Sequence, residues 1–479
     1  MEESLREERL KKLDEIKSEG IDPYPAKAER DFSLAEAREK FEDGKEASIA
    51  GRVMSVRDQG NIIFIDIKDE SDSFQLVLKK ELTDKIDFWR KVLDRGDFVS
   101  AKGKLFTTQK GEKSLETKEL KILTKALLPI PSEWYGVEDV ETRLRKRYLD
   151  LLSNPETKQL FIKKTLFWDT TRNFLKKAGF MEVETSVMEE VPGGADAEPF
   201  LTHHNALNQD FYLRISLELP LKRLIVGGFD RVFEIGKVFR NEGVDREHLQ
   251  EYTSLEFYWA YADYKDLMRF TEKMYKKIIE KVLGGLKSNW QGVEIDWGGK
   301  WQRIDYVKIF RTENNGLNPS RASEEKLVKR AEELGISLAP GLGKGKLIDL
   351  IYKKTVRPKL IQPAFLINHP VEISPLSKKS ERDPGLVERI QVVACGTELG
   401  NGWSEINDPL DQLARFEEQE KARAKGDKEA QRLDEDYVEA LEYGMPPTAG
   451  FGLSERLFAV LMDKPVRETV LFPLMRPKR

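Results

Sequence analysis

Residues 238–258 (VFRNEGVDREHLQEYTSLEFY) place an arginine, several acids and two tyrosines within a short segment. Arg240 ends an apolar run, so its guanidinium is expected at a strand end facing a cleft, where its planar donors suit a carboxylate or a phosphate. Tyr252 opens the next strand, and its flat ring suits stacking on a base. Glu256 and Tyr258 share parity on that strand, so both point to one face. A ladder of Arg–Glu ion pairs across a hairpin explains these residues equally well.

Residues 396–408 (GTELGNGWSEIND) gather polar groups around one aromatic ring. Glu398, Asn401 and Glu405 lie close to Trp403 in the sequence. Carboxylate oxygens of this kind bind a hard metal ion, and an acid beside an aromatic wall binds an ammonium group. The alternative without a ligand is a polar, glycine-rich, bulged strand.

Residues 444–461 (GMPPTAGFGLSERLFAVL) place Gly450 and Gly452 just before a predicted helix that carries Arg456. Glycines let the backbone approach a ligand closely, and an arginine covers a nucleobase by cation–π stacking. Taken alone, the segment is better explained as a glycine-bearing turn from a strand to a helix.

The elements that must position these side chains follow from periodicity. From residue 145 onward, strand patterns are often separated by polar loops of hairpin length rather than by regular crossover helices, with one long amphipathic helix ending at Gly179. This pattern predicts an α+β domain around a mostly antiparallel sheet with flanking helices. No glycine-rich dinucleotide fingerprint follows a strand, and no phosphate-binding P-loop motif occurs.

Residues 48–124 have a different character, with about five short β-rich runs and one helix separated by turns. They predict a five-stranded β-barrel of the OB type, a fold that binds single-stranded nucleic acid on one face but also serves other purposes. We expect an N-terminal helix over residues 1–30, the OB-type domain over 31–126, a linker over 127–144 and the catalytic domain over 145–479.

The composition narrows the class of protein. The chain has 479 residues, 34% of them charged, with a net charge of −4, so any surface for nucleic acid must be local. Cys395 is the single cysteine, which excludes an internal disulfide and a cysteine zinc site and fits a reducing cytoplasm. No run of about 18 apolar residues predicts a membrane span.

Taken together and in this order, these segments and GFMEVET (179–185) resemble the motifs of class II aminoacyl-tRNA synthetases, and more narrowly the lysyl-tRNA synthetases. The resemblance covers roughly residues 48–479. It implies an anticodon-binding barrel, a catalytic domain on an antiparallel sheet, and a cytoplasmic homodimer. The implied reaction joins L-lysine to tRNA(Lys) with ATP and Mg²⁺ through a lysyl-adenylate.

The resemblance also implies roles for particular residues. Arg240 and Arg456 are the implied catalytic residues. ATP would be held by Arg240, Glu242, His248, Tyr252 and Arg456. Lysine would be held by Glu218, Glu256, Tyr258, Asn401, Trp403 and Glu405. The metal would lie at Glu398 and Gln391. The anticodon would be contacted by Arg57, Phe64, Gln75 and Glu112, with Phe64 as barrel core the alternative.

Three departures from the family pattern affect these expectations. Ser186 stands where motif 1 usually has a proline near the dimer interface. Gln391 stands where a second metal-binding carboxylate is usual, which predicts fewer or looser Mg²⁺ ions. The segment GFGLSER is one residue shorter than motif 3, so Arg456 reaches the adenine only if the turn absorbs the deletion.

These departures keep alternatives open. The chain could be a catalytically weakened paralogue that binds tRNA or another RNA, an enzyme that lysylates a protein, or an enzyme specific for aspartate or asparagine. A buried acid at Glu405 disfavours aspartate and asparagine, because it would be left unpaired beside a neutral or acidic side chain.

Overall fold

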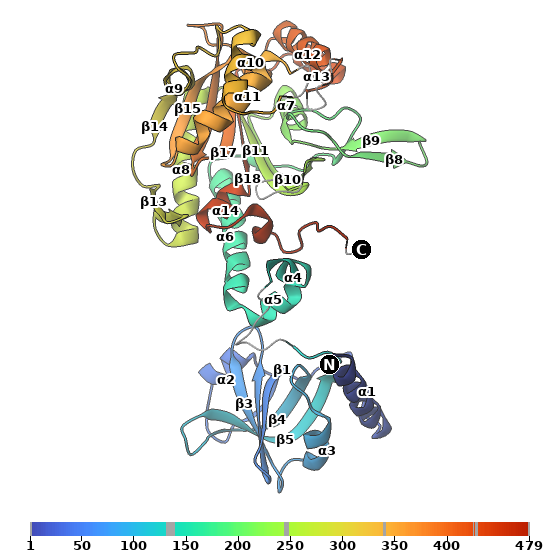
Figure 1. Ribbon diagram of the computed structural model, residues 1–479. Coiled ribbons are helices and arrows are strands. Elements are labelled where there is room, and N and C mark those ends of the chain that lie inside the picture. The colour runs from blue at the N-terminus through green and yellow to red at the C-terminus, as the bar shows by residue number, and fades with distance from the viewer. Residues whose placement is uncertain are drawn as a thin grey trace. The chain divides into compact units, whose positions relative to one another are not determined.

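The computed structural model describes residues 2–130, 139–243, 249–338, 342–424, 426 and 430–477. The chain divides into two compact units, Met1–Glu138 and Asp139–Arg479 (Figure 1). Each unit is described by itself below.

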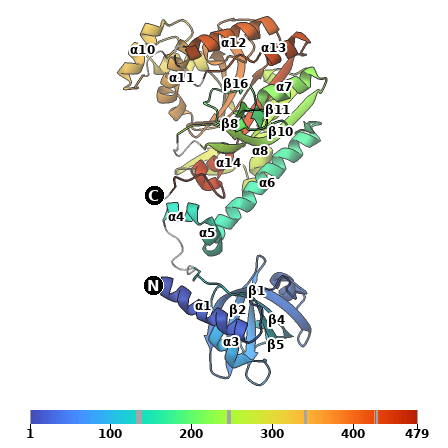
Figure 2. The ribbon, with the colours of Figure 1, turned by 90° about the vertical axis from the view of Figure 1, so that its right-hand side faces the viewer.

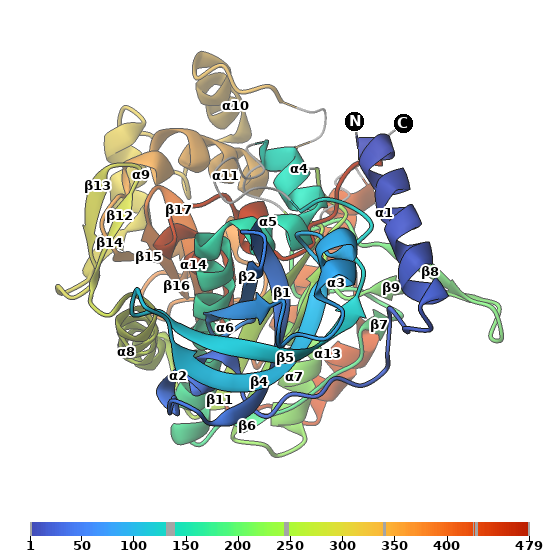
Figure 3. The same ribbon diagram turned by 90° about the horizontal axis from the view of Figure 1, so that it is seen from below.

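The first unit is built on a closed ring of five strands in the order β1-β2-β3-β5-β4. In β2, Ile63, Ile65 and Ile67 are buried while Phe64 and Asp66 lie on the outer face, as the alternation of a strand requires. Helices α1 and α3 lie side by side on one flank of the ring (Figure 3). The predicted five-stranded OB-type fold is confirmed. The elements are α1 (Glu2–Ser18), α2 (Leu34–Glu39), β1 (Glu46–Asp58), β2 (Ile62–Lys68), β3 (Ser73–Lys79), α3 (Ile86–Val92), β4 (Phe98–Thr107) and β5 (Lys113–Thr124).

The second unit is built on an eight-stranded sheet in the order β14-β15-β16-β17-β18-β11-β10-β6. All neighbours are antiparallel except the pairs at the two edges, β14–β15 and β10–β6, which are parallel. The predicted antiparallel sheet is therefore confirmed. The strands are β6 (Met181–Glu182), β10 (Arg231–Phe239), β11 (Glu251–Ala260), β14 (Gln302–Asp305), β15 (Ala364–Pro370), β16 (Leu386–Ala394), β17 (Thr397–Ser404) and β18 (Thr448–Ser454).

The two faces of this sheet differ in chemistry. On β11, Leu255 and Phe257 point to one face, where they join a large apolar core with residues of α6 and α8. These two helices, α6 (Pro155–Lys177) and α8 (Tyr264–Leu283), lie side by side on that face (Figure 2). Glu256 and Tyr258 point to the other face. The alternation of apolar and polar residues on β11 thus separates the core from the candidate site.

The remaining elements surround this sheet. Helices α9 (Tyr306–Glu313), α10 (Glu324–Glu333) and α11 (Lys344–Thr355) form a second core with β14 and β15. Helices α7 (Glu218–Val226), α12 (Pro409–Ala424) and α13 (Glu435–Glu442) pack together in another. The other elements are α4 (Val140–Arg145), α5 (Arg147–Ser153), β7 (Met188–Glu189), β8 (Leu201–His204), β9 (Gln209–Leu213), β12 (Lys287–Trp290), β13 (Val293–Asp296), α14 (Arg456–Leu461) and the 3₁₀ turns Arg357–Lys359, Val371–Ile373 and Val466–Thr469.

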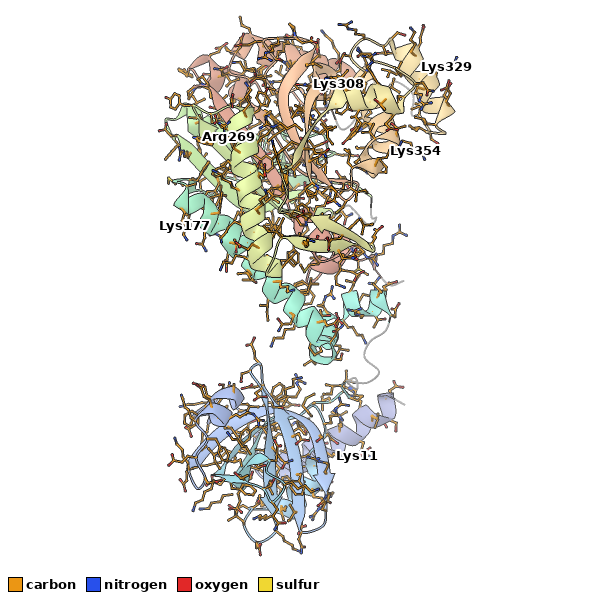
Figure 4. All side chains as sticks on the ribbon, turned by 90° about the vertical axis from the view of Figure 1, so that its left-hand side faces the viewer. Lys11, Lys177, Arg269, Lys308, Lys329 and Lys354 are labelled. Atoms are coloured by element: carbon orange, nitrogen blue, oxygen red, sulfur yellow. The ribbon has the colours of Figure 1, made fainter. Side chains whose placement is uncertain are left out.

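Charged side chains cover the outer surfaces of the helices. Lys177, Arg269, Lys308 and Lys354 are exposed and project outward from α6, α8, α9 and α11 (Figure 4). Within the described residues, every helix is too short or too polar to cross a bilayer.

Candidate active site

Two rows of paired residues run across the polar face of the sheet, and their register positions the candidate site. One row joins Gln391 on β16, Asn401 on β17, Gly452 on β18 and Glu256 on β11. The other row joins Arg389, Trp403, Gly450 and Tyr258 on the same four strands. Residues that pair directly across antiparallel strands share a face. Segments more than 140 residues apart in the chain are thereby brought onto one floor.

Tight packing at Gly450 of β18 leaves no room for a side chain there. A Cβ added at Gly450 would lie 2.3 Å from the ring of Tyr258 and 2.4 Å from Oε1 of Glu405. These distances are far inside van der Waals contact, so position 450 accepts no side chain without displacing one of these groups. The missing side chain at position 450 therefore allows Tyr258 and Glu405 to pack closely against β18.

A cavity of about 890 Å³ lies over this floor. The sequence-predicted residues that line it are Glu218, Arg240, Glu242, Tyr252, Glu256, Tyr258, Gln391, Glu398, Asn401, Trp403 and Arg456. Glu405 is not among the lining residues, because it lies behind Trp403 and Gly450. His248 lies outside the described residues.

Arg240 stands at the end of β10, as its position after an apolar run predicted. Its Nε donates a hydrogen bond to the carbonyl oxygen of Ile215 at 3.3 Å, and its guanidinium lies 5.5 Å from the ring centre of Tyr252. Burial disfavours its charge, but Tyr252, Glu242 and Glu256 outweigh that effect and raise its pKa. Arg240 therefore presents a permanent positive charge to the cavity.

The turn that carries Arg456 is short but keeps this side chain at the cavity. Strand β18 ends at Ser454 and α14 begins at Arg456, so Glu455 alone connects them. Glu455 is buried, and its carboxylate binds Lys164 of α6. Burial raises the pKa of the Tyr252 hydroxyl, and the charges of Arg240 and Arg456 oppose that rise. Both arginines are thus close enough to Tyr252 to affect its pKa, and all three residues line the cavity.

Buried acids gather in and directly behind the cavity wall. Glu218, at the start of α7, and Glu256 are 2% and 8% exposed, and Glu405 is 1% exposed. The backbone N–H of Leu217 donates to Glu256 Oε1 at 2.9 Å, and Tyr258 Oη donates to Glu256 Oε2 at 3.1 Å. Burial and the neighbouring Glu218 raise the pKa of Glu256 to about 7. Such a cluster of acids is suited to bind amino groups.

A β-bulge brings Glu398 to the same face as Asn401. The register of β16 and β17 shifts between Val392 and Val393, which leaves Leu399 as an extra residue. Leu399 turns into the core, where the hydroxyl of Tyr275 on α8 donates to its carbonyl oxygen at 2.7 Å. The carboxylate of Glu398 then accepts hydrogen bonds from the amides of Asn401 (2.6 Å) and Gln391. Glu398 thus presents a carboxylate, the kind of group that ligates a hard metal ion, to this part of the cavity.

The structure also shows participants that the sequence did not reveal. Lys222 is completely buried, and its ammonium contacts both Glu218 and Glu405. Arg389 donates from Nε to Asn401 Oδ1 at 3.0 Å and lies 5.8 Å from the ring centre of Trp403. A lysine one turn after an acid in a mostly apolar helix was the available signal for Lys222, because a buried charge needs a partner.

In the first unit, hydrogen bonds connect the predicted anticodon residues. Arg57 contacts both carboxylate oxygens of Asp66 at 3.2 Å, and Gln75 Nε2 is 3.5 Å from Asp66 Oδ1. Ser114 Oγ bonds Gln75 at 3.1 Å and the backbone oxygen of Glu112 at 3.3 Å. Asp66 and Ser114 were not predicted. Phe64 is partly exposed beside Arg57, outside the apolar core of the ring, so its interpretation as barrel core is wrong.

Comparisons with known proteins agree with this architecture. Residues 139–476 match the family described as tRNA synthetases class II (D, K and N), and residues 47–123 match the family described as OB-fold nucleic acid binding domain. The chain therefore belongs to the class II tRNA synthetases, and the resemblance found in its motifs is confirmed.

Individual proteins within this family are similar to the chain over its full length. A protein of Moorella thermoacetica named lysine–tRNA ligase is 42% identical over 483 residues, which cover 100% of this chain and 99% of the relative. Proteins of the same name from Carboxydothermus hydrogenoformans (44% identical, 98% and 97% covered) and Thermotoga maritima (42%, 100% and 97%) match equally broadly. Over its full length, the chain is similar to proteins named lysine–tRNA ligase.

Proposed function

We propose that the chain ligates L-lysine to tRNA(Lys) in two steps. Lysine and ATP first form lysyl-adenylate and pyrophosphate; a hydroxyl of the terminal ribose of the tRNA then takes the lysyl group, and AMP leaves. The observation that carries this proposal is one cavity lined both by Arg240 and by the buried acids Glu218 and Glu256. Nothing in the comparisons or the described residues favours a catalytically weakened paralogue.

In the first step, the carboxylate of lysine forms a bond to the α-phosphorus of ATP while pyrophosphate leaves. The substrate itself supplies the nucleophile, so the chain needs no covalent intermediate. We assign to Arg240 the neutralisation of the charge that develops at phosphorus, together with the alignment of the two reactants. Tyr252 and Arg456 would hold the adenine between them, and Glu242 and His248 would hold the rest of the nucleotide.

Selectivity for lysine is assigned to the buried acids. Glu218 and Glu256 would receive the α-amino group, and Tyr258 with Glu405 would receive the ε-ammonium, with Asn401 and Trp403 as walls. A neutral or acidic side chain would bring no ammonium to Glu405 Oε1, which has no hydrogen-bond partner among the described residues, and a buried charged group left unsatisfied in this way costs about 1–3 kcal/mol or more. Aspartate and asparagine are therefore rejected on charge.

The residues at Glu398 fit a magnesium ion held jointly with phosphate oxygens. A carboxylate in the cavity wall is the ligand that Mg²⁺ prefers. Gln391 presents its N–H to Glu398 and accepts from Tyr352 Oη at 3.2 Å, so its carbonyl would face a cation only after the amide turns. When bound, the ion would supply neutralisation of phosphate charge.

We expect Gln391→Glu to lower the Mg²⁺ concentration needed for ATP binding several-fold, because it adds a second charged oxygen beside Glu398. The measurement is a thermal-shift titration of Mg²⁺ at fixed ATP, with Gln362→Glu, an exposed change outside the cavity, as the control. An unchanged midpoint for Gln391→Glu would contradict a role for this position in metal binding.

The proposed function is tested by amino-acid-dependent exchange of pyrophosphate into ATP, with each of the twenty amino acids in turn. Exchange with lysine alone is the expected result. No exchange at any Mg²⁺ concentration would remove the proposal, and exchange with aspartate or asparagine would reassign the substrate. Transfer to tRNA and to protein acceptors is then compared, because a protein acceptor has no anticodon for the OB-type domain to contact.

For the OB-type domain, which we assign to residues 31–126, we propose binding of the anticodon, with Phe64 stacked on a base and Gln75 and Glu112 contacting base edges. Phe64→Ala should raise the KM for tRNA about tenfold, because base stacking contributes roughly 1–3 kcal/mol. Pyrophosphate exchange should not change. Phe98→Ala is a matched control, since Phe98 also lies under an arginine, Arg52 at 4.2 Å. Equal effects of both variants would count against the assignment.

We further propose that the protein acts as a cytoplasmic homodimer. Exposed apolar side chains on α6 and near motif 1 support this proposal, since large exposed apolar surface is typical of protein interfaces. They include Ile162, Leu166, Met181, Val187 and Met188. Ser186 lies in this region, and its hydroxyl bonds the carbonyl oxygen of Met188 at 2.7 Å. Sedimentation at micromolar concentration decides between a monomer and a dimer.

A further inference from the structure

Lys222 occupies an unusual position behind the amino-acid end of the cavity. It lies on α7 one turn after Glu218 and is 0% exposed. Its Nζ contacts Glu218 Oε1 and Glu405 Oε2. The surrounding ring centres lie about 6 Å from the ammonium and belong to Tyr258, Trp403 and Tyr437. One buried ammonium group thus joins the two acids that are proposed to receive the two amino groups of the substrate.

The two oxygens of Glu405 have different surroundings. Oε2 accepts from Lys222 and from Trp403 Nε1, the latter at 2.8 Å. Oε1 is buried and has no hydrogen-bond partner among the described residues. It lies against Gly450, a residue that lines the cavity, so closely that a Cβ added there would be 2.4 Å away. A buried carboxylate oxygen without a partner is costly, so this oxygen is suited to accept a donor that the ligand brings.

A purely structural interpretation treats Lys222 as a counter-ion for one buried acid. The charges around it do not balance in that way, because two carboxylates, Glu218 and Glu405, face a single ammonium. Burial raises the pKa of Glu405, and Glu218 adds to that rise while Lys222 opposes it. Burial disfavours the charge of Lys222, but Glu218 and Glu405 outweigh it and raise its pKa. Lys222 therefore stays charged while the acids share protons.

We propose that Lys222 is a positioning residue for the amino-acid substrate: its ammonium fixes the Glu405 carboxylate so that Oε1 alone is left without a partner, beside Gly450 of the cavity floor, and it ties that carboxylate to Glu218. The distance between the two receiving acids is thereby held constant, and one oxygen is reserved for the ε-ammonium. This proposal rests on the proposed activation of lysine.

The charge balance gives the proposal a pH signature. The groups that face Glu405 are Lys222 and Glu218 on α7, Tyr258 on β11, Trp403 on β17 and Tyr437 on α13. The two ammonium groups of lysine would bind these acids in their ionised form, so the protons that the acids share must leave before lysine binds. The KM for lysine should therefore fall as the pH rises through about 7 and about 8, the values to which the pKa of Glu256 and the pKa of Glu405 are raised. Without the cation at 222, the carboxylates would hold protons to higher pH.

The test is lysine-dependent pyrophosphate exchange by Lys222→Met, which keeps the shape of the side chain but removes its charge. We expect the KM for lysine to rise on the order of 100-fold, while the KM for ATP stays constant and kcat changes little. We also expect the fall of the lysine KM to move to higher pH. The matched control is Lys125→Met in the first unit, which removes a lysine equally buried against Asp94 and Asp97.

The outcomes separate the proposal from the activity on which it rests. A wild-type protein without lysine-dependent exchange defeats the proposed function itself. A wild-type protein that exchanges, with a Lys222→Met variant that keeps the lysine KM and its pH profile, defeats only the role of Lys222. If Lys222→Met does not fold, Lys222→Gln keeps a donor for one of the two acids, and an unchanged lysine KM in that variant overturns the proposal.

Discussion

Arg240→Gln is expected to reduce lysine-dependent pyrophosphate exchange by on the order of 10³-fold. The guanidinium stands at the end of β10, beside Tyr252 and over the cavity, where the substrate carboxylate and the α-phosphate would meet. Glutamine keeps a donor but loses the charge and the planar fork. The loss should appear in kcat more than in either KM, because the charge at phosphorus is greatest in the transition state.

The control for this variant lies on the same strand. Arg231, at the other end of β10, donates to the carbonyl oxygen of Ala178 at 2.6 Å and lies 4.8 Å from the ring centre of Trp259, away from the cavity. Arg231→Gln should lower the melting temperature and leave kcat near that of the wild type. Equal losses of activity in the two variants would mean that Arg240 acts through stability alone.

Glu405→Gln is expected to raise the KM for lysine by roughly 10²- to 10³-fold, which corresponds to about 3–5 kcal/mol for a buried charge left without its partner. The substituted amide has the same shape but no charge for the ε-ammonium, and it also removes one partner of Lys222. The KM for ATP should not change. Steady-state exchange kinetics with each substrate varied in turn provide the measurement.

Glu234 offers a matched control for this second variant. It is 3% exposed and bonds Arg214 at 2.7 Å, but it does not line the cavity. Glu234→Gln should destabilise the second unit without a selective effect on lysine. If both glutamine variants raise the lysine KM equally, the acid at 405 has no special role in selection.

Several features could be predicted because they depend on local pattern. The alternation on β11 assigns Glu256 and Tyr258 to one face, and the apolar run before Arg240 assigns that arginine to a strand end. Both positions agree with the structure. The ring of five strands followed from short β-rich runs separated by turns.

Other features depend on pairing between distant segments, which local pattern does not contain. The alignment of Gly450 between Tyr258 and Trp403 requires the register of three strands. Strict alternation would place Glu398 and Asn401 on opposite faces of β17, and only the extra residue Leu399 brings them together. The contact of Lys222 with Glu405 joins α7 to a residue 183 positions later in the chain (405 − 222).

The bulge at Leu399 has a consequence for movement. Side chains on the two faces of a sheet ordinarily do not contact each other, because the backbone lies between them. Here the hydroxyl of Tyr275, on α8 at the apolar face of the sheet, donates a hydrogen bond to the carbonyl oxygen of Leu399, the residue that follows Glu398. A shift of α8 would therefore be passed to Glu398 through a single peptide unit, so movement in the apolar core is expected to reach the part of the cavity that Glu398 lines.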